Sequence, residues 1–275
     1  MRIKVLLREI SNLFAWRDIP VKSHDLVLDV GSGDNPHVRA DVLCDAHLLN
    51  SGERSGKFDL VVDGRPFIFA DACKMPFKNK AFDFIICSHL LEHMSNPSDL
   101  LEELMRVGKA GYIESPSSLM ERLYGWNFHR LLVDYDGNSL VIRPKAKDEK
   151  YGIIPEEIKK NASWERFVKD NRQCFLASYL WRERIEYRIE GTFPIEKEVK
   201  PESFSETPST SLRRRARWWV TKFMRFFVAR RRFKIEDILA CPECHAELQI
   251  RGGKVLCPQC KIAYSVLGQK IYKFI

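Results

Sequence analysis

Short apolar runs alternate with polar segments over the first two thirds of the chain. Five of these runs predict buried β-strands, at residues 27–30, 40–45, 67–72, 82–88 and 111–115. Residues 99–107 instead carry apolar side chains at the spacing of an α-helix. Because strands that alternate with helices favour crossover connections, we expect a parallel sheet. The pattern predicts a doubly wound, mostly parallel α/β domain over residues 1–194.

The last third of the chain divides into three shorter parts. Residues 195–212 are poor in apolar side chains and rich in Ser, Thr, Pro and Glu, which is typical of a linker. Residues 213–234 combine basic and aromatic side chains and predict a helix. Residues 235–275 contain four closely spaced cysteines and predict a separate small module.

The composition favours a folded protein without a membrane span. Apolar residues make up 45% of the chain and charged residues 30%, which is enough for a buried core. All apolar runs are far shorter than the roughly 20 residues needed to cross a bilayer. The first residues also lack the apolar core of a signal peptide. We therefore expect a cytoplasmic protein.

The net charge of +8 comes from a single segment. Residues 213–234 hold ten Lys or Arg and no acid, and removing these ten from the 45 basic residues leaves 35 against 37 acidic ones. Such a helix has three interpretations: it packs on the catalytic domain, lies peripherally on an anionic membrane, or contacts RNA phosphates. The sequence leaves all three open.

A glycine loop and two acids follow the first three predicted strands. Gly31-Ser32-Gly33 is a nucleotide-binding loop candidate, because glycine lets the backbone come close to a ligand. Asp45 ends the second predicted strand, where a carboxylate can accept both hydroxyls of a ribose. Asp71 ends the third, where it can accept from the amine of an adenine. Since the carboxyl ends of parallel strands meet at one edge, these residues predict a site for an adenosine-bearing ligand.

NAD and S-adenosylmethionine both contain a ribose that such an acid can bind. The dinucleotide fingerprint has a third glycine where this chain has Pro36, and it uses a helix N-terminus to hold a pyrophosphate. S-adenosylmethionine has no phosphate and does not need that helix end. The loop therefore lacks a feature that NAD binding requires and S-adenosylmethionine binding does not.

The segments VLDVGSGDNP, DACKMPF and FDFIICSHLLEHM resemble class I S-adenosylmethionine-dependent methyltransferases of the ubiquinone/menaquinone-biosynthesis type, over about residues 25–116. The resemblance implies a cofactor pocket. Asp29, Gly31 and Gly33 would border the methionine part of the cofactor, and Asp45 would bind the ribose. Asp71 and Ala72 would face the adenine, and Ser88 with His89 would close the pocket. The chain departs from the family in one respect, because residues 33–41 are too few for the usual first helix.

Two histidines are candidates for a catalytic base. Methyl transfer from a sulfonium is an in-line displacement, so the protein mainly aligns the reactants, although a hydroxyl acceptor needs a base. His89 lies at the carboxyl end of the fourth predicted strand, and an unperturbed histidine titrates near neutrality. His129 lies in a hairpin predicted over residues 125–142 with its turn at Asp136-Gly137. The alternative is that this hairpin is structural.

The motifs after the fourth predicted strand bear on the acceptor. Glu92 and His93 are expected to orient the following helix. The chain lacks the Asn/Asp-Pro-Pro-aromatic tetrapeptide of many amino-group methyltransferases, and it has no Pro-Cys step. The resemblance favours a small-molecule or glycan- or lipid-linked acceptor. The alternatives are an RNA methyltransferase acting on tRNA or rRNA, supported by the basic segment and the cysteine module, and a non-catalytic scaffold.

The C-terminal cysteines predict a structural zinc site. Two Cys-x2-Cys pairs stand twelve residues apart, which is the pattern of a tetrahedral four-thiolate site formed by Cys241, Cys244, Cys257 and Cys260. Four thiolates leave no open position for a substrate. Residues 235–275 also resemble the zinc-ribbon activator subunit of several tRNA, rRNA and release-factor methyltransferases. That resemblance implies a ribbon that docks on its own methyltransferase domain.

Overall fold

The computed structural model describes residues 19–46, 63–146, 149–191, 193, 233–268 and 270–275. The predicted linker at 195–212 and most of the basic aromatic segment at 213–234 lie outside these ranges, so both remain predictions. Within the described ranges, no helix combines the length and the apolar character that a membrane crossing requires.

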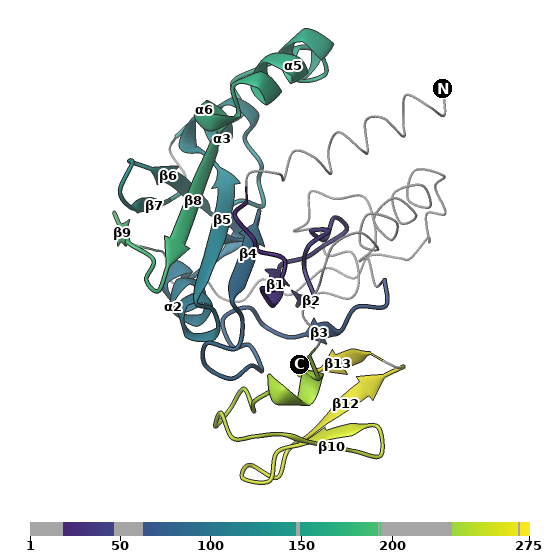
Figure 1. The fold of residues 1–275 in the computed structure, drawn as a ribbon. Helices are drawn as coiled ribbons and strands as arrows, with labels where there is room; N and C mark the ends of the chain where they lie inside the picture. The colour runs from purple at the N-terminus through teal and green to yellow at the C-terminus, as the bar shows by residue number, and fades with distance from the viewer. Residues whose placement is uncertain (1–18, 47–62, 147–148, 192, 194–232, 269) are drawn as a thin grey trace, which may run out of the picture.

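Six strands of the N-terminal part lie side by side in one sheet (Figure 1). In spatial order they are β3 (Phe67–Phe69), β2 (Val42–Asp45), β1 (Val27–Val30), β4 (Phe84–Ser88), β5 (Ala110–Pro116) and β8 (Leu176–Arg182). The strands from β3 to β5 are parallel to their neighbours, and β8 is antiparallel to β5. The predicted mostly parallel α/β sheet is thereby confirmed.

Both faces of the parallel strands are buried, which is why the sequence shows continuous apolar runs rather than alternation. In β1, Leu28 and Val30 belong to the larger hydrophobic cluster, whereas Val27 belongs to a second one. Successive side chains of a strand point to opposite faces, so the two clusters lie on opposite sides of the sheet. The crossover from β4 to β5 contains α2 (Pro97–Val107), which begins two residues earlier than predicted because Pro is favoured in the first turn.

The predicted hairpin is also present. Strands β6 (Leu131–Tyr135) and β7 (Leu140–Pro144) are antiparallel, and β9 (Tyr187–Ile189) pairs with β7 in a separate sheet. The Asp136 carboxylate accepts hydrogen bonds from the amides of Asn138 and Ser139, which fixes the turn. The other short helices before the ribbon are η1 (Leu91–His93), α3 (Ser118–Tyr124), α4 (Glu156–Lys159), α5 (Ala162–Asp170) and α6 (Arg172–Phe175).

The third strand is shorter than predicted. It ends at Phe69, so Asp71 lies in the turn that follows the strand and not on the strand itself. The amide of Ala70 still donates to the carbonyl of Asp45 in the neighbouring strand. The chain then leaves the sheet, because the amide of Lys74 closes a turn on the carbonyl of Asp71.

The cysteine module extends the same sheet. Its elements are η2 (Ile235–Asp237), β10 (Gln249–Arg251), β11 (Lys254–Leu256), β12 (Ala263–Leu267) and β13 (Ile271–Lys273). Strand β13 pairs in parallel with β3, so ten strands of the described residues form one continuous sheet (Figure 1). The cysteine module thus docks on the N-terminal domain of the same chain through backbone hydrogen bonds, as the sequence resemblance implied.

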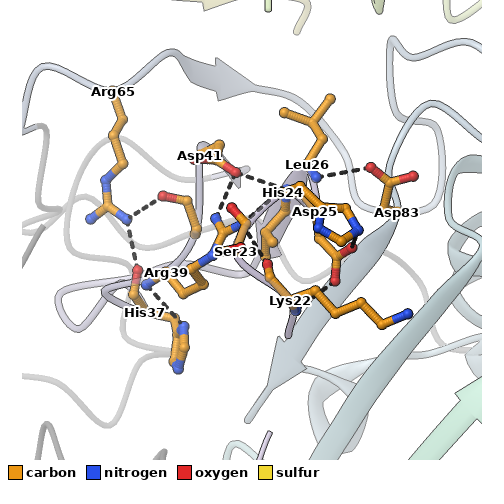
Figure 2. Close-up of polar contacts among 12 residues, drawn as sticks. Lys22, Ser23, His24, Asp25, Leu26, His37, Arg39, Asp41, Arg65 and Asp83 are labelled. Atoms are coloured by element: carbon orange, nitrogen blue, oxygen red, sulfur yellow. Dashed lines mark hydrogen bonds and ion pairs between the residues drawn. The ribbon is translucent and has the colours of Figure 1, made fainter. Parts of the chain in front are cut away.

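No helix connects β1 to β2, in agreement with the short segment noted in the sequence. Figure 2 shows what holds this crossover in place. The Arg39 guanidinium donates to the Asp41 carboxylate at 2.9 Å and to the carbonyls of Lys22, Ser23 and Asp25. Asp41 in turn accepts from the amide of Val27 in β1. The buried Arg39 therefore anchors the crossover to β1 and to the segment before it, in place of a helix.

A second buried arginine completes this network from the β3 side. The Arg65 guanidinium donates to the carbonyls of His37 and Ala40, at 2.7 and 3.2 Å (Figure 2). It also forms an ion pair with Asp63. Arg65 thus supplies donors to two carbonyls inside the crossover, where no helix does so, whereas Arg39 ties the crossover to the segment before β1.

Candidate functional site

The glycine loop folds over the end of β2. Gly31 and Gly33 have φ angles of +70° and +53°, which other residues rarely adopt. The amides of Gly31 and Ser32 donate to the carbonyl of Cys44 at 2.9 and 3.2 Å, and the amide of Gly33 donates to the Asp45 carboxylate at 3.0 Å. The glycine loop and the acid at the end of β2 are therefore held together by hydrogen bonds.

Asp29 is buried in β1 beneath this loop. Its carboxylate accepts a 2.6 Å hydrogen bond from the amide of His37. Burial raises the pKa of Asp29 to about 7, although this hydrogen bond and the charge of Arg65 act in the opposite direction. The structure thus gives Asp29 a part in shaping the crossover, and its contact with the methionine part of a cofactor remains a prediction.

The two acids predicted to contact adenosine lie at neighbouring strands. Asp45 pairs in register with Phe69 of β3, two residues before Asp71. Asp45 is buried against the glycine loop, whereas Asp71 is exposed and accepts from the amide of Cys73 at 2.9 Å. Ala72, also predicted to face the adenine, is half-buried beside it.

The residues around the loop fit S-adenosylmethionine. The Ser32 hydroxyl is buried and has no hydrogen-bond partner among the described residues, so a polar ligand atom would satisfy it. A side chain added at Gly33 would meet only the carbonyl of Gly31 at 3.7 Å, which leaves space for a ligand. Gly31, by contrast, lies against Leu90, which closes the other side of the loop.

The ribbon holds the segment that carries Asp71 and Ala72. The amide of Lys78 donates to the carbonyl of Ile238 at 2.9 Å, and the amide of Ala240 donates to the carbonyl of Pro76 at 3.0 Å. Phe77 of this segment is fully buried in the cluster that also contains Cys241. The conformation of the predicted adenine side therefore depends on the folded ribbon.

Ser88 and His89 face a pair of buried carboxylates at the ends of β4 and β5. The Ser88 hydroxyl lies 3.4 Å from the Glu114 carboxylate. The His89 ring lies between Glu92 and Glu114, with nitrogen–oxygen distances of 3.4 and 3.6 Å, and its own side chain is 50% exposed. Burial lowers the pKa of His89, but the close approach and charge of Glu92 and the charge of Glu114 outweigh it and raise the pKa. The two carboxylates thus favour the protonated form of His89 over the neutral form that a base requires.

His129 reaches the same region from the segment before β6. Its Nδ1 lies 2.7 Å from the Glu121 carboxylate, and its ring packs edge-on against His93 at 4.8 Å. Glu92 lies between the two predicted bases, because His89 contacts it and His129 is within ligand distance of it. From the sequence, Glu92 was expected only to orient the following helix, and its contacts with these two histidines were not predicted; the catalytic role of both histidines stays a prediction.

Glu114 and Glu121 were missed by the sequence analysis. Glu114 lies in an apolar strand and is fully buried, where Arg172 donates to both of its carboxylate oxygens at 2.8 and 2.7 Å. An acid inside an otherwise apolar run was the one available signal, because buried charges are nearly always paired. Glu121 lies in α3, and the residues around it carry no such signal.

The four cysteines of the ribbon lie together at the geometry of a zinc site. The Sγ atoms of Cys241 and Cys260 are 4.0 Å apart, and those of Cys244 and Cys257 are 3.5 Å apart. Zinc–sulfur bonds of about 2.3 Å place tetrahedral sulfurs about 3.8 Å apart, and a disulfide requires about 2.05 Å. The cluster fits a structural zinc ion and not a disulfide pair.

Two protein-family models match the chain. Residues 28–113 match the family described as a methyltransferase domain, and residues 232–266 match the family described as Trm112p-like protein. The chain therefore carries a methyltransferase domain of the S-adenosylmethionine-dependent class, followed by a Trm112p-like zinc ribbon. The domain implies S-adenosylmethionine as cofactor, and the ribbon with its four cysteines implies structural zinc.

Several solved structures also match the chain. One is a SAM-dependent methyltransferase from Methanosarcina mazei, with 17% identity, 38% of this chain and 56% of that chain covered, and a TM-score of 0.27. Another is the YcgJ protein from Bacillus subtilis, with 19% identity, 42% and 51% covered, and a TM-score of 0.29. The chain thus spans about half the length of these two proteins.

A third match is a complex of the Haloferax volcanii Trm112 methyltransferase activator with a methyltransferase. It has 16% identity, 64% of this chain and 89% of that chain covered, and a TM-score of 0.37. The search of curated proteins found no match.

Proposed function

We propose that this chain transfers a methyl group from S-adenosylmethionine to a small-molecule or glycan- or lipid-linked acceptor. The observation that carries the proposal is the arrangement at three neighbouring strand ends. The glycine loop after β1, Asp45 at the end of β2 and Asp71 after β3 lie at one edge of a parallel sheet, where open α/β sheets bind their ligands.

The chain's own residues supply binding and alignment. Bound S-adenosylmethionine brings an electrophilic methyl group, so the protein has to hold the acceptor in line with it and exclude water. Asp45 would accept from the ribose, Asp71 from the adenine amine, and Ser32 would donate to or accept from a polar atom of the cofactor. The side chains of Ser88, His89 and His129 then lie on the acceptor side, at the ends of β4 and before β6.

Calorimetry tests the cofactor assignment. We expect the zinc-loaded full chain to bind S-adenosylmethionine and S-adenosylhomocysteine, and Asp45→Ala and Asp71→Ala each to weaken binding at least tenfold. The matched control is Asp170→Ala, an exposed carboxylate on α5, which should bind as the wild type does. Unchanged affinity in both variants would overturn the residue roles, and no binding by the wild type would support the scaffold alternative.

The acceptor class is tested with methyl-labelled cofactor and fractionated cell extract. Label that enters small or lipid-extractable products and persists after ribonuclease treatment supports the proposal. Label that disappears with ribonuclease identifies RNA as the acceptor. In that case, RNA affinity should fall steeply with salt and depend on the cations of residues 213–234. Flotation with anionic liposomes tests the peripheral membrane contact of the same segment.

A further inference from the structure

A cluster of one carboxylate and two imidazoles lies apart from the zinc ribbon, at the carboxyl end of β4. Glu92 and His93 belong to η1, directly after that strand, and His129 lies in the segment before β6. The amide of Arg130 donates to the carbonyl of Glu92 at 2.8 Å, which fixes the His129 segment against η1. Residues far apart in the sequence are therefore brought together by backbone bonding and not by a flexible side-chain contact.

The ligand atoms of these three side chains all lie within 4.8 Å of one another. Bonds of about 2.0–2.2 Å from a metal ion to imidazole nitrogen and carboxylate oxygen place the ligand atoms about 3–4 Å apart. Small side-chain rotations are enough to reach that geometry. His93 is only half-buried, so an ion can enter from its side.

Glu92 presents one carboxylate oxygen to this cluster. It is 1% exposed, and its Oε2 accepts a 2.7 Å hydrogen bond from the Ser115 hydroxyl. Its Oε1 is buried and has no hydrogen-bond partner among the described residues, although the His89 ring approaches it to 3.4 Å. A buried carboxylate oxygen without a hydrogen bond is costly unless a ligand satisfies it.

His129 is oriented in the way that metal-binding histidines usually are. Its Nδ1 lies 2.7 Å from the buried Glu121 carboxylate, which selects the tautomer with the proton on Nδ1. The Lys145 ammonium group lies 2.5 Å from the other oxygen of Glu121 and forms an ion pair with it, which holds that carboxylate in place. The lone pair of Nε2 is thereby left for a ligand.

We propose that Glu92, His93 and His129 bind a divalent transition-metal ion, with Glu121 as a positioning residue for His129. Imidazole nitrogen favours Zn²⁺, Fe²⁺ and Co²⁺, and a carboxylate oxygen also suits Mn²⁺. Three protein ligands leave coordination positions open, in contrast to the four-thiolate ribbon, and open positions are typical of catalytic metal sites.

The site also defines an acceptor class, and this step rests on the proposed methyl transfer. An ion at the ends of β4 and η1 would bind an acceptor hydroxyl and lower its pKa. The oxygen–carbon bond then forms as the sulfur–carbon bond breaks, the hydroxyl proton leaves to solvent and S-adenosylhomocysteine departs as a neutral thioether. The proposed acceptor is therefore an alcohol or phenol.

Cobalt titration tests the metal site directly. The full chain is first loaded with zinc, freed of loose metal on a chelating resin and checked by elemental analysis for zinc in the ribbon. Added Co²⁺ should then bind as one further equivalent, with visible d–d bands and without the sulfur-to-cobalt charge-transfer band of a thiolate site. Absence of this binding in the wild type overturns the proposal, whatever the variants do.

Variants identify the ligands. Glu92→Gln and His129→Gln should each lose at least tenfold in Co²⁺ affinity, and Glu121→Gln should lose about 10- to 100-fold because it keeps all three ligands but weakens the orientation of one. The matched control is His24→Gln, whose side chain is 78% exposed. Wild-type affinity in Glu92→Gln and His129→Gln would contradict the assignment. Calorimetry with S-adenosylmethionine on the same samples separates failure of this site from failure of the methyltransferase proposal.

Discussion

The amide of His37 donates a 2.6 Å hydrogen bond to the buried carboxylate of Asp29, which fastens the helix-free crossover to β1. Burial raises the pKa of Asp29 to about 7, and burial together with the charges of Arg65 and Arg39 lowers the pKa of His37 to about 3. Both groups are therefore largely uncharged in the folded protein at mildly acidic pH. Because the neutral form is the protonated one for an aspartate and the deprotonated one for a histidine, the two groups change the stability in opposite directions as the pH rises.

The wild-type protein should lose stability as the pH rises because of Asp29, and Asn at this position should abolish that loss (Asp29→Asn). A carboxyl whose folded pKa lies above its unfolded value of 3.8 binds more protons when folded, so stability falls as pH rises from about 4 to about 7. The shift of roughly 3 pKa units corresponds to about 4 kcal/mol. Urea unfolding at pH 5 and pH 8 should show the variant gaining on the wild type at the higher pH. Parallel pH profiles of the two proteins would contradict the burial assigned to this carboxyl.

His37→Gln should abolish a dependence of stability on pH that has the opposite sign, in which stability falls as the pH falls. A histidine whose folded pKa is lowered binds fewer protons when folded, so it contributes stability above about pH 6.5 that is lost as pH falls toward 3. We expect the variant to lose less stability than the wild type between pH 7 and pH 5 in the same unfolding experiment. His24→Gln, an exposed histidine, is the control and should keep the wild-type profile.

Arg39→Met should destabilise the whole domain because it leaves Asp41 buried without its counter-charge. The side chains of Arg39 and Asp41 are 8% and 3% exposed. Removing one partner of a buried ion pair costs about 3–5 kcal/mol. Thermal and urea unfolding should show this loss, whereas Arg184→Met, at a side chain that is 77% exposed, should change little. A loss below about 1 kcal/mol would show that the crossover does not depend on this arginine.

Gly31→Ala should weaken cofactor binding. An added Cβ would lie 3.2 Å from the Leu90 side chain, and the φ angle of +70° costs a non-glycine residue about 1–2 kcal/mol. Leu90→Ala in the same chain should relieve the contact but not the backbone cost, so affinity should recover in part. Gly64→Ala, which has a φ angle of +85° and open space around it, measures backbone cost away from the loop. Calorimetric affinity equal to that of the wild type in Gly31→Ala would remove the loop from the cofactor site.

The sequence predicted the sheet well because its signal is local. Continuous apolar runs mark strands that are buried on both faces, and the strand at 27–30 was predicted with its observed bounds. The end of the third strand was predicted too late, since the turn at Asp71 depends on hydrogen bonds from neighbouring segments. Element ends are set by such non-local bonds, which the apolar pattern does not contain.

The candidate site was predicted where residues act through type and spacing, as with the glycine loop and the four cysteines. The acidic partners of the histidines could not be predicted in the same way. Glu121 and His129 meet only because α3 and the segment before β6 are packed together, and Glu92 meets His129 through a backbone bond across many residues. These contacts arise from tertiary packing, for which one sequence offers no periodic signal.

Loss of zinc should affect the predicted adenine side of the cofactor site as well as the ribbon. Strand β13 pairs with β3, and the amide of Phe67 donates to the carbonyl of Lys270 at 2.9 Å. A small ribbon of this kind depends on its metal for folding. In Cys241→Ser, or in the wild type after chelation, we therefore expect faster amide hydrogen exchange at residues 67–69 and 76–78, and weaker binding of S-adenosylmethionine.

The matched control for this experiment is Cys174→Ser, because that cysteine is exposed in α6 and lies outside the metal cluster. It should leave zinc content, exchange and affinity unchanged. If exchange in Cys241→Ser rises only within residues 235–275, the ribbon does not support the Asp71 segment. The continuous sheet would then be a docking contact without influence on the cofactor site. Faster exchange in β3 together with unchanged cofactor affinity would instead remove Asp71 from the predicted adenine contact.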